Sequence, residues 1–300
     1  MNILITGGRG QLGNELARIL IDMEAEAGPV PASYAGATWD AIDYQELDIS
    51  DAAAVDAWFA SHEYGLVINC AAVTNVDGCE TDEEGAYRVN ALGPENLARA
   101  SARQGAKLVQ VSTDYVFPGN VPGDRVEDDP TGPISAYGRT KLAGEQLAMA
   151  ANPRTFVCRT AWLYGYVGRN FVKTMRSLGA RLERITVVDD QVGNPTSAND
   201  LALHILRVAE TEGYGTYHMT NKGTCSWCDF AARIMGRSGL ACEVAPVTSE
   251  QYKAANPQSA DRPHFSSLRN RRLEETVGDG FRDWRDAIDM YIDRLPELEG

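Results

Sequence analysis

The sequence is poor in positive charge. Its 300 residues hold 28 Lys and Arg against 42 Asp and Glu, which gives a formal net charge of −14. Such a surface repels nucleic acid and anionic membranes, and we expect neither as a partner. An anionic small-molecule ligand would need local help from arginines, backbone amides or a helix N-terminus.

Long hydrophobic runs are also missing. No apolar stretch approaches the roughly 20 residues that cross a bilayer as a helix. Met1 leads directly into a strand-like apolar run at residues 3–5, which leaves no room for a signal peptide. We therefore expect a cytoplasmic protein without a membrane partner. Hydrophobic content of 44% and charged content of 23% are those of a globular chain that can bury a large core.

Cysteine is scarce, with six residues in the chain. In the cytoplasm we expect these thiols to be reduced. Cys225 and Cys228 have the spacing of a metal or redox pair, but no second Cys or His pair with ligand spacing accompanies them. The sequence therefore predicts no metal site.

Only five lysines are present, and one of them, Lys141, follows Tyr137 by four residues. On a helix the two side chains would lie one above the other on the same face. An ammonium group beside a phenol lowers the phenol pKa, so Tyr137 could donate a proton near neutral pH. Thr113, at the end of an apolar strand at 107–112, could hold a carbonyl oxygen against that phenol. This is the apparatus for reducing a ketone by hydride transfer.

The Tyr–Lys spacing is informative only beside a nicotinamide site, because chance alone yields roughly 0.2 such pairs in a chain of this composition. The N-terminus predicts that site. Gly7, Gly10 and Gly13 lie between an apolar strand at 2–6 and helical periodicity at 15–23. The glycines allow a tight turn, close approach to a pyrophosphate and packing of helix on strand. The spacing is GxxGxxG rather than GxGxxG, so its position between strand and helix carries the interpretation.

Acidic residues follow the second predicted strand, at 38–42. Asp43 or Asp40 could bind an adenosine ribose. Arg9 could instead neutralise a 2′-phosphate, which leaves NADH and NADPH both open. Asp48 either lies near the adenine or caps the following helix.

The order of elements predicts the fold. A buried strand at 65–72 ends in small residues, against which a dinucleotide can lie, and further strands at 107–112 and 155–160 alternate with helices. This order predicts an α/β fold with a Rossmann-type doubly wound parallel sheet and a smaller mixed α/β C-terminal lobe. We expect the cofactor domain at 1–160 plus about 182–212. The substrate lobe is expected at about 161–181 plus 213–300.

Together these patterns resemble the extended short-chain dehydrogenase/reductases, and within them the dTDP-4-dehydrorhamnose reductases, over nearly the full length. The subfamily resemblance rests on Ser-Thr-Asp-Tyr-Val-Phe at 112–117, Arg-Thr-Ala-Trp at 159–162 and Asp-Gln-Val-Gly-Asn-Pro-Thr at 190–196. It implies hydride delivery from NADPH or NADH to the C4 ketone of dTDP-4-dehydro-β-L-rhamnose. The product would be dTDP-L-rhamnose for polysaccharide biosynthesis.

The resemblance also implies roles for individual residues. Thr113, Tyr137 and Lys141 would form the catalytic triad, and Asn90 would support a proton relay. The cofactor would be lined by Gly7, Gly10, Gln11, Leu12, Gly13, Asp48, Ile49, Ala71, Ala72, Tyr137, Lys141 and Thr160. The substrate candidates are Thr74, Thr113, Tyr115, Tyr137, Trp162, Asn170 and Arg262.

Three alternatives are weighed against the reductase. A 4,6-dehydratase needs an Asp-Glu pair after the threonine, and here Tyr115 follows Asp114, so elimination is disfavoured. An epimerase needs only the same triad and a tightly held cofactor. A regulatory subunit resembling the beta subunit of methionine adenosyltransferase has the same fold without catalysis, but the intact triad favours an enzyme.

Assembly is expected to be a monomer or homodimer. Some family members bind magnesium between subunits through glutamates. Glu15 is present, but Asn199 stands where a second glutamate is expected, which argues against metal-mediated dimerisation.

Overall fold

A six-stranded parallel sheet forms the centre of the computed structural model, which describes residues 1–299, with side chains described through Leu295. The strand order is β12-β7-β6-β5-β1-β4. The strands are β1 (Asn2–Thr6), β4 (Thr38–Ile42), β5 (Leu66–Asn69), β6 (Lys107–Thr113), β7 (Thr155–Thr160) and β12 (Gly215–His218). The chain runs outward from β1 to β4 and returns across β1 to β5. Loops diverge at this reversal, so a crevice opens at the carboxyl ends of the strands.

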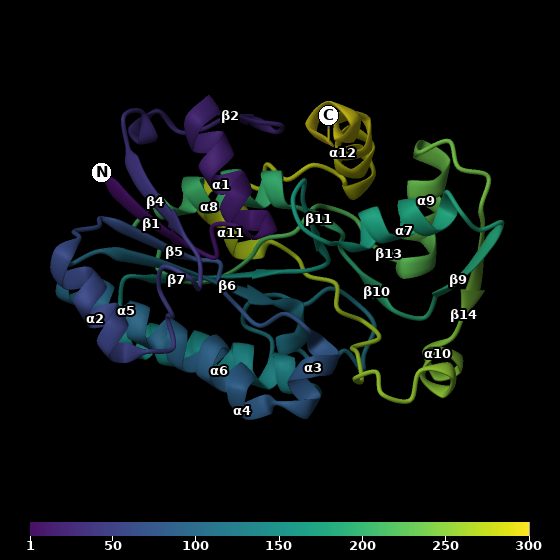
Figure 1. The fold of residues 1–300 in the computed structure, drawn as a ribbon, viewed down its shortest axis with the longest axis horizontal. Coiled ribbons are helices and arrows are strands. Elements are labelled where there is room, and N and C mark those ends of the chain that lie inside the picture. The colour runs from purple at the N-terminus through teal and green to yellow at the C-terminus, as the bar shows by residue number, and fades with distance from the viewer. Residues whose placement is uncertain (300) are drawn as a thin grey trace.

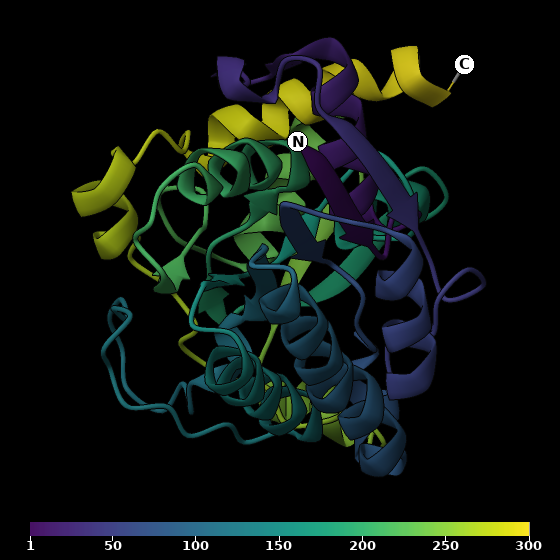
Figure 2. The same ribbon diagram turned by 90° about the vertical axis from the view of Figure 1, so that its left-hand side faces the viewer.

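Helices cover both faces of the sheet (Figure 1, Figure 2). One face carries α2 (Ala52–Ser61), α5 (Gly93–Arg103) and α6 (Ala136–Ala151), and the other carries α1 (Gln11–Asp22), α8 (Ala198–Ala209) and α11 (Arg271–Val277). The two-residue period of the strands divides the apolar side chains between these layers. Leu4 and Val67 pack in the core of the α2 and α5 face, whereas Ile5 and Ile68 pack in the core beneath α1 and α8. The predicted doubly wound fold is confirmed.

A second lobe lies beside the carboxyl ends of the strands, at the right of Figure 1. Its core joins α7 (Phe171–Gly179), α9 (Trp227–Arg237) and α12 (Trp284–Glu299) to a parallel pair of strands, β9 (Arg184–Val188) and β14 (Glu243–Val247). Smaller pairs connect β8 (Leu163–Tyr164) to β11 (Thr196–Ser197) and β10 (Val192–Gly193) to β13 (Cys225–Ser226). The remaining elements are β2 (Glu24–Ala25), β3 (Gly28–Pro29), η1 (Ala32–Tyr34), α3 (Val76–Thr81), α4 (Glu83–Tyr87), η2 (Arg88–Leu92), η3 (Asp114–Val116) and α10 (Ser249–Ala255).

Strand pairing joins two segments to elements of the other predicted lobe. Residues 215–218, predicted in the substrate lobe, form β12 and pair with β7 at the edge of the central sheet. Residues 184–188, predicted in the cofactor domain, form β9, and Ile185 and Val187 pack in the core of the second lobe. Both are short strands whose partners are distant in sequence, so local pattern could not assign them. With these changes, the two-lobe division stays a prediction.

Of the helices within residues 1–299, none combines the length and the apolar character needed to cross a membrane.

Candidate active site

A cavity of about 920 Å³ lies at the carboxyl ends of β1, β5, β6 and β7 and reaches the second lobe. It brings together the glycine turn, the ends of the central strands, the start of α6 and the segment that follows β7. All the residues predicted to line the cofactor border this cavity: Gly7, Gly10, Gln11, Leu12, Gly13, Asp48, Ile49, Ala71, Ala72, Tyr137, Lys141 and Thr160. Predicted substrate residues that border it are Thr74, Thr113, Tyr115, Tyr137, Trp162 and Asn170.

The glycine turn leaves no room for a side chain at Gly7 or Gly13. Gly7 has φ +67°, and a Cβ there would lie 2.8 Å from the backbone nitrogen of Ala71. A Cβ on Gly13 would overlap the Gly7 carbonyl. The turn therefore holds β1, α1 and the end of β5 in backbone contact, with the free amides at the start of α1 beside the cavity. The Thr160 hydroxyl is buried and has no hydrogen-bond partner among the residues that the structure describes. This cradle and that hydroxyl fit a nicotinamide dinucleotide.

The structure separates the two acidic candidates after β4. Asp43 borders the cavity and accepts a hydrogen bond from the Arg9 backbone nitrogen at 3.2 Å. Asp40 lies elsewhere and accepts from the Tyr64 hydroxyl at 2.7 Å. The Arg9 guanidinium contacts Gln45 and Glu46. Of the two carboxylates, only Asp43 borders the cavity.

Asp48 borders the cavity and does not cap the next helix. Its carboxylate accepts from the Ser50 backbone at 2.9 Å and the Ser50 hydroxyl at 2.7 Å. Asp51 caps α2 by accepting from the amides of Ala53 and Ala54.

The predicted triad converges where β6 meets the start of α6. Ser135 caps α6 by accepting from the Gly138 amide at 3.2 Å. The absence of a side chain on Gly138 lets the helix approach the Tyr115 carbonyl, which a Cβ would overlap. The Thr113 side chain lies beside the Tyr137 phenol and lowers its pKa against the effect of burial. The hydroxyls of strand and helix thus face one another at the cavity wall.

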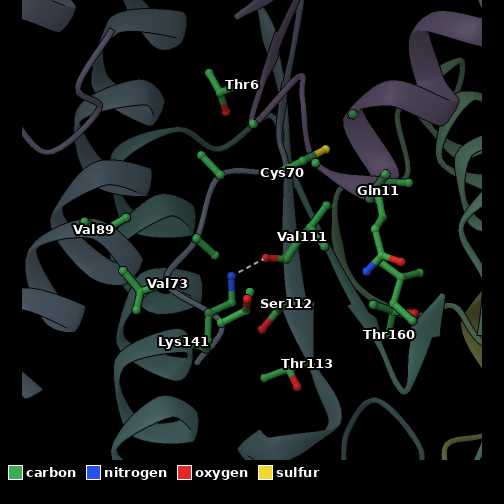
Figure 3. Close-up of a pocket in the computed structure, with 18 of the residues that line it drawn as sticks. Thr6, Gln11, Cys70, Val73, Val89, Val111, Ser112, Thr113, Lys141 and Thr160 are labelled. Carbon is green, nitrogen blue, oxygen red and sulfur yellow. Dashed lines mark hydrogen bonds between the residues drawn. The ribbon is translucent and has the colours of Figure 1, made fainter. Parts of the chain in front are cut away.

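The prediction that Lys141 lowers the pKa of Tyr137 is wrong in this structure. The Lys141 ammonium donates to the Val111 carbonyl at 2.7 Å (Figure 3). Burial raises the pKa of Tyr137, and the Thr113 side chain offsets only part of that rise. Burial lowers the pKa of Lys141 to about 8. Desolvation dominates both groups, and the phenol stays protonated at neutral pH, as a proton donor requires.

Asn90 lies behind the cavity wall in the π-turn η2. Its Oδ1 accepts from the Val73 amide at 2.8 Å, and its Nδ2 donates to the Val73 carbonyl at 3.0 Å and the Thr140 hydroxyl at 3.2 Å. These contacts hold the loop after β5 against α6. The proton-relay role stays a prediction.

Arg262 does not border the cavity. Its guanidinium donates to Asp77 Oδ1 at 3.0 Å, and the same oxygen accepts from the Ala260 amide at 2.8 Å. Burial raises the pKa of Tyr115, which does border the cavity, and the positive charge of Arg262 offsets part of that rise.

The second lobe contributes a pair of stacked tryptophans, Trp162 and Trp227, of which the sequence predicted only Trp162 as a site residue. Trp162 has φ +47°, a left-handed conformation that non-glycine residues rarely adopt. Its indole stacks on Trp227 with ring centroids 3.6 Å apart and an interplanar angle of 7°. A Cβ on Gly193 would lie 2.6 Å from the Trp162 ring. Trp227 lies between Cys225 and Cys228, which we considered only as a metal or redox pair, and both thiols are free.

Asn170 joins the second lobe to the glycine turn. Its Nδ2 donates to Gln11 Oε1 at 3.0 Å and to the Gly165 carbonyl at 2.8 Å, while Oδ1 caps α7 through the Lys173 amide. Its hydrogen-bonding groups are thus engaged within the chain.

Asp114 is the main site residue that sequence reasoning missed, since we considered it only in excluding a dehydratase. It is buried, borders the cavity and accepts from the Thr113 hydroxyl at 3.0 Å. Its Oδ2 has no hydrogen-bond partner among the described residues. Burial raises its pKa to about 6. Its position next to Thr113 was the available signal.

Glu15 and Asn199 contact each other within the chain. Asn199 donates to Glu15 Oε2 at 2.8 Å and accepts from the Glu26 amide at 2.7 Å, while Glu15 also pairs with Arg18 at 2.8 Å.

Comparison with known proteins agrees with this geometry. The family described as RmlD substrate binding domain matches residues 1–296. The crystal structure of a dTDP-4-dehydrorhamnose reductase from Clostridium acetobutylicum is similar with a TM-score of 0.91 and 45% identity, covering 99% of this chain and 100% of that one. The enzyme of the same name from Bacillus anthracis, solved in complex with NADP, has a TM-score of 0.87 and 37% identity over 100% of this chain and 99% of that one. The dTDP-4-dehydrorhamnose reductase of Mycobacterium tuberculosis is 40% identical over 95% of this chain and 90% of its own.

Proposed function

The chain belongs to the RmlD substrate binding domain family, and from this membership we propose that it reduces the C4 ketone of dTDP-4-dehydro-β-L-rhamnose with NADPH or NADH. The product is dTDP-L-rhamnose, and the enzyme is a dTDP-4-dehydrorhamnose reductase. The observation that carries the proposal is that Thr113, Tyr137 and Lys141 border the same cavity as the glycine turn.

The residues that would hold the cofactor lie along one wall of the cavity. The amides at the start of α1 suit the pyrophosphate, Asp43 suits the adenosine ribose, and Ala71 and Ala72 leave room for the dinucleotide. The Lys141 ammonium suits the nicotinamide ribose hydroxyls. When bound, NADPH or NADH supplies the hydride, and the protein supplies orientation and electrostatics.

The proton comes from Tyr137. Because burial raises its pKa, the phenol holds its proton until a carbonyl oxygen gains negative charge beside it. The Thr113 hydroxyl orients that oxygen. Lys141, one helical turn further along α6, places a positive charge where charge develops.

The assay is oxidation of NADPH or NADH with dTDP-4-dehydro-β-L-rhamnose, generated in place from dTDP-glucose by the two preceding enzymes. Oxidation with dTDP-L-rhamnose as product supports the proposal. Both cofactors are run, because Asp43 suits a ribose hydroxyl whereas Arg9 suits a 2′-phosphate. Cofactor binding without oxidation would contradict the substrate assignment and favour another keto-sugar or a regulatory role.

The pH dependence of kcat/KM should be bell-shaped. We expect a loss below about pH 6, because Asp114 then takes up a proton and no longer accepts hydrogen bonds as a carboxylate. We expect a second loss above about pH 8, because Lys141 loses its charge. Asp114→Asn should remove the acid limb and lower kcat/KM by roughly tenfold or more. An acid limb that persists in Asp114→Asn would exclude Asp114 as its source.

Trp227→Ala should raise KM for the sugar nucleotide by roughly tenfold and leave KM for NADPH unchanged. The substitution removes the ring that holds Trp162 against the cavity, and aromatic contacts of this kind are worth about 1 kcal/mol beyond buried area. Trp227→Phe keeps a ring at the position and serves as the matched control. Equal KM values for the sugar nucleotide in Trp227→Ala and the wild type would exclude a substrate role for the pair.

A further inference from the structure

Helix α6 presents three polar side chains to strand β6. Tyr137, Lys141 and Glu145 are spaced by four residues and therefore lie on one face of the helix. Tyr137 borders the active-site cavity beside Thr113, and Lys141 donates to the Val111 carbonyl. The third residue, Glu145, has no part in the proposed chemistry.

Glu145 is fully engaged beneath the active site. Its Oε1 accepts from the Ser112 hydroxyl at 2.5 Å and from Arg159 Nε at 2.9 Å, and its Oε2 accepts from Arg159 Nη2 at 2.7 Å. The side chains of Glu145 and Arg159 are 1% and 6% exposed. This is a bidentate, charge-assisted pair in the protein interior.

The pair ties α6 to two neighbouring strands. Ser112 of β6 and Arg159 of β7 are register partners in the sheet. The Arg159 guanidinium also lies over the Phe117 ring, 5.2 Å from its centroid, which limits its rotation. Glu145 thus accepts a hydrogen bond from Ser112, the residue next to Thr113, and is itself held by Arg159 of the neighbouring strand.

Elsewhere α6 approaches its neighbours closely at two glycines. Gly138 approaches the Tyr115 carbonyl, and Gly144 approaches the Asn90 carbonyl so closely that a Cβ would overlap it. A buried ion pair is weak evidence for stability, because an apolar pair of similar volume is often as stable. The two hydrogen bonds between Glu145 and Arg159, however, fix the orientation of one side chain relative to the other.

We propose that Glu145, held by Arg159 and Ser112, is a positioning residue that sets the height and rotation of α6, so that Tyr137 and Lys141 meet β6 in the reactive geometry. This inference rests on the proposed function and adds a residue outside the cavity to it. Glu145 also acts on Lys141 electrostatically, since its carboxylate lies one turn away. Glu145 from the same helix and Cys70 from the loop after β5 are the titratable groups that raise the pKa of Lys141 against the effect of burial.

The test is Glu145→Gln, which keeps the shape and removes the charge. We expect kcat to fall about 10- to 100-fold and the alkaline limb of kcat/KM to move to lower pH. The matched control is Glu83→Gln. Glu83 of α4 pairs bidentately with Arg139 of α6, at 2.8 and 2.7 Å, but both side chains face solvent. The control should keep the wild-type rate and pH profile.

A folded Glu145→Gln protein with wild-type kcat and an unmoved alkaline limb would overturn the proposal. If that variant does not fold, Ser112→Ala tests the proposal instead, because it removes one hydroxyl and leaves the Glu145–Arg159 ion pair intact. We expect a several-fold loss of kcat without a change in Tm, and wild-type kcat would overturn the proposal.

The pH dependence of NADPH affinity, read by cofactor fluorescence, provides a second measurement. It tests whether Glu145→Gln moves the Lys141 transition even when no keto-sugar is turned over. A wild-type protein that binds NADPH but reduces no substrate contradicts the proposed function alone. An unmoved transition in folded Glu145→Gln contradicts the positioning role.

Discussion

Tyr137→Phe should lower kcat for keto-sugar reduction by roughly 10²- to 10⁴-fold, the range that a positioned general acid contributes. The ring remains packed against Tyr115, whose centroid lies 5.5 Å away, so only the phenolic hydroxyl is lost. NADPH affinity, measured by fluorescence titration, should stay close to that of the wild type.

Tyr64→Phe is the control for this experiment, because it removes a hydroxyl bonded to Asp40 outside the cavity. It should keep wild-type kcat. A Tyr137→Phe enzyme that retains wild-type kcat would exclude this phenol as the proton donor, and one that loses NADPH binding would indicate that the substitution disturbs the cavity as a whole.

Lys141→Met should lower kcat/KM by roughly 10²- to 10³-fold and weaken NADPH binding. Methionine nearly preserves the length of the side chain but removes both the positive charge and the donor to the Val111 carbonyl. The loss combines weaker anchoring of the nicotinamide ribose with weaker stabilisation of the developing oxyanion. Steady-state rates and fluorescence titration separate the two effects.

Lys141→Met should not lower the stability of the folded protein, although it lowers activity. Burial lowers the pKa of Lys141 to about 8 in the folded chain, below the value of about 10.4 for an exposed lysine. Between these values the unfolded chain binds more protons, so wild-type stability gains a contribution as pH rises. Lys141→Met removes this contribution and the cost of a buried charge near pH 7. Its Tm at pH 7 should equal or exceed that of the wild type. A large fall in Tm would show that Lys141 holds the fold rather than the chemistry.

Local sequence was sufficient for the central features. An apolar run, three glycines at fixed spacing and a following helix predict the turn around Gly7 and Gly13, because each part depends only on neighbouring residues. Tyr137 and Lys141 could be paired from helix periodicity alone, and Thr113 from its place at the end of a strand. All five residues border one cavity in the structure.

Features that depend on distant residues were not predicted. The stacking of Trp227 on Trp162 joins the start of α9 to the segment after β7 across 65 residues of sequence, and Arg262 contacts Asp77 across 185. No local pattern specifies which of several surfaces such a residue meets.

The sequence by itself determined the doubly wound sheet, the dinucleotide turn and the identity of the reacting groups, because propensity, periodicity and strand-end position are local properties. Only the tertiary structure decided the burial that sets the pKa values of Tyr137, Lys141 and Asp114, the partner strands of β9 and β12, and the Glu145–Arg159 pair behind the active site. Desolvation and long-range pairing depend on which surfaces the folded chain brings together, and that information is not contained in any single stretch of sequence.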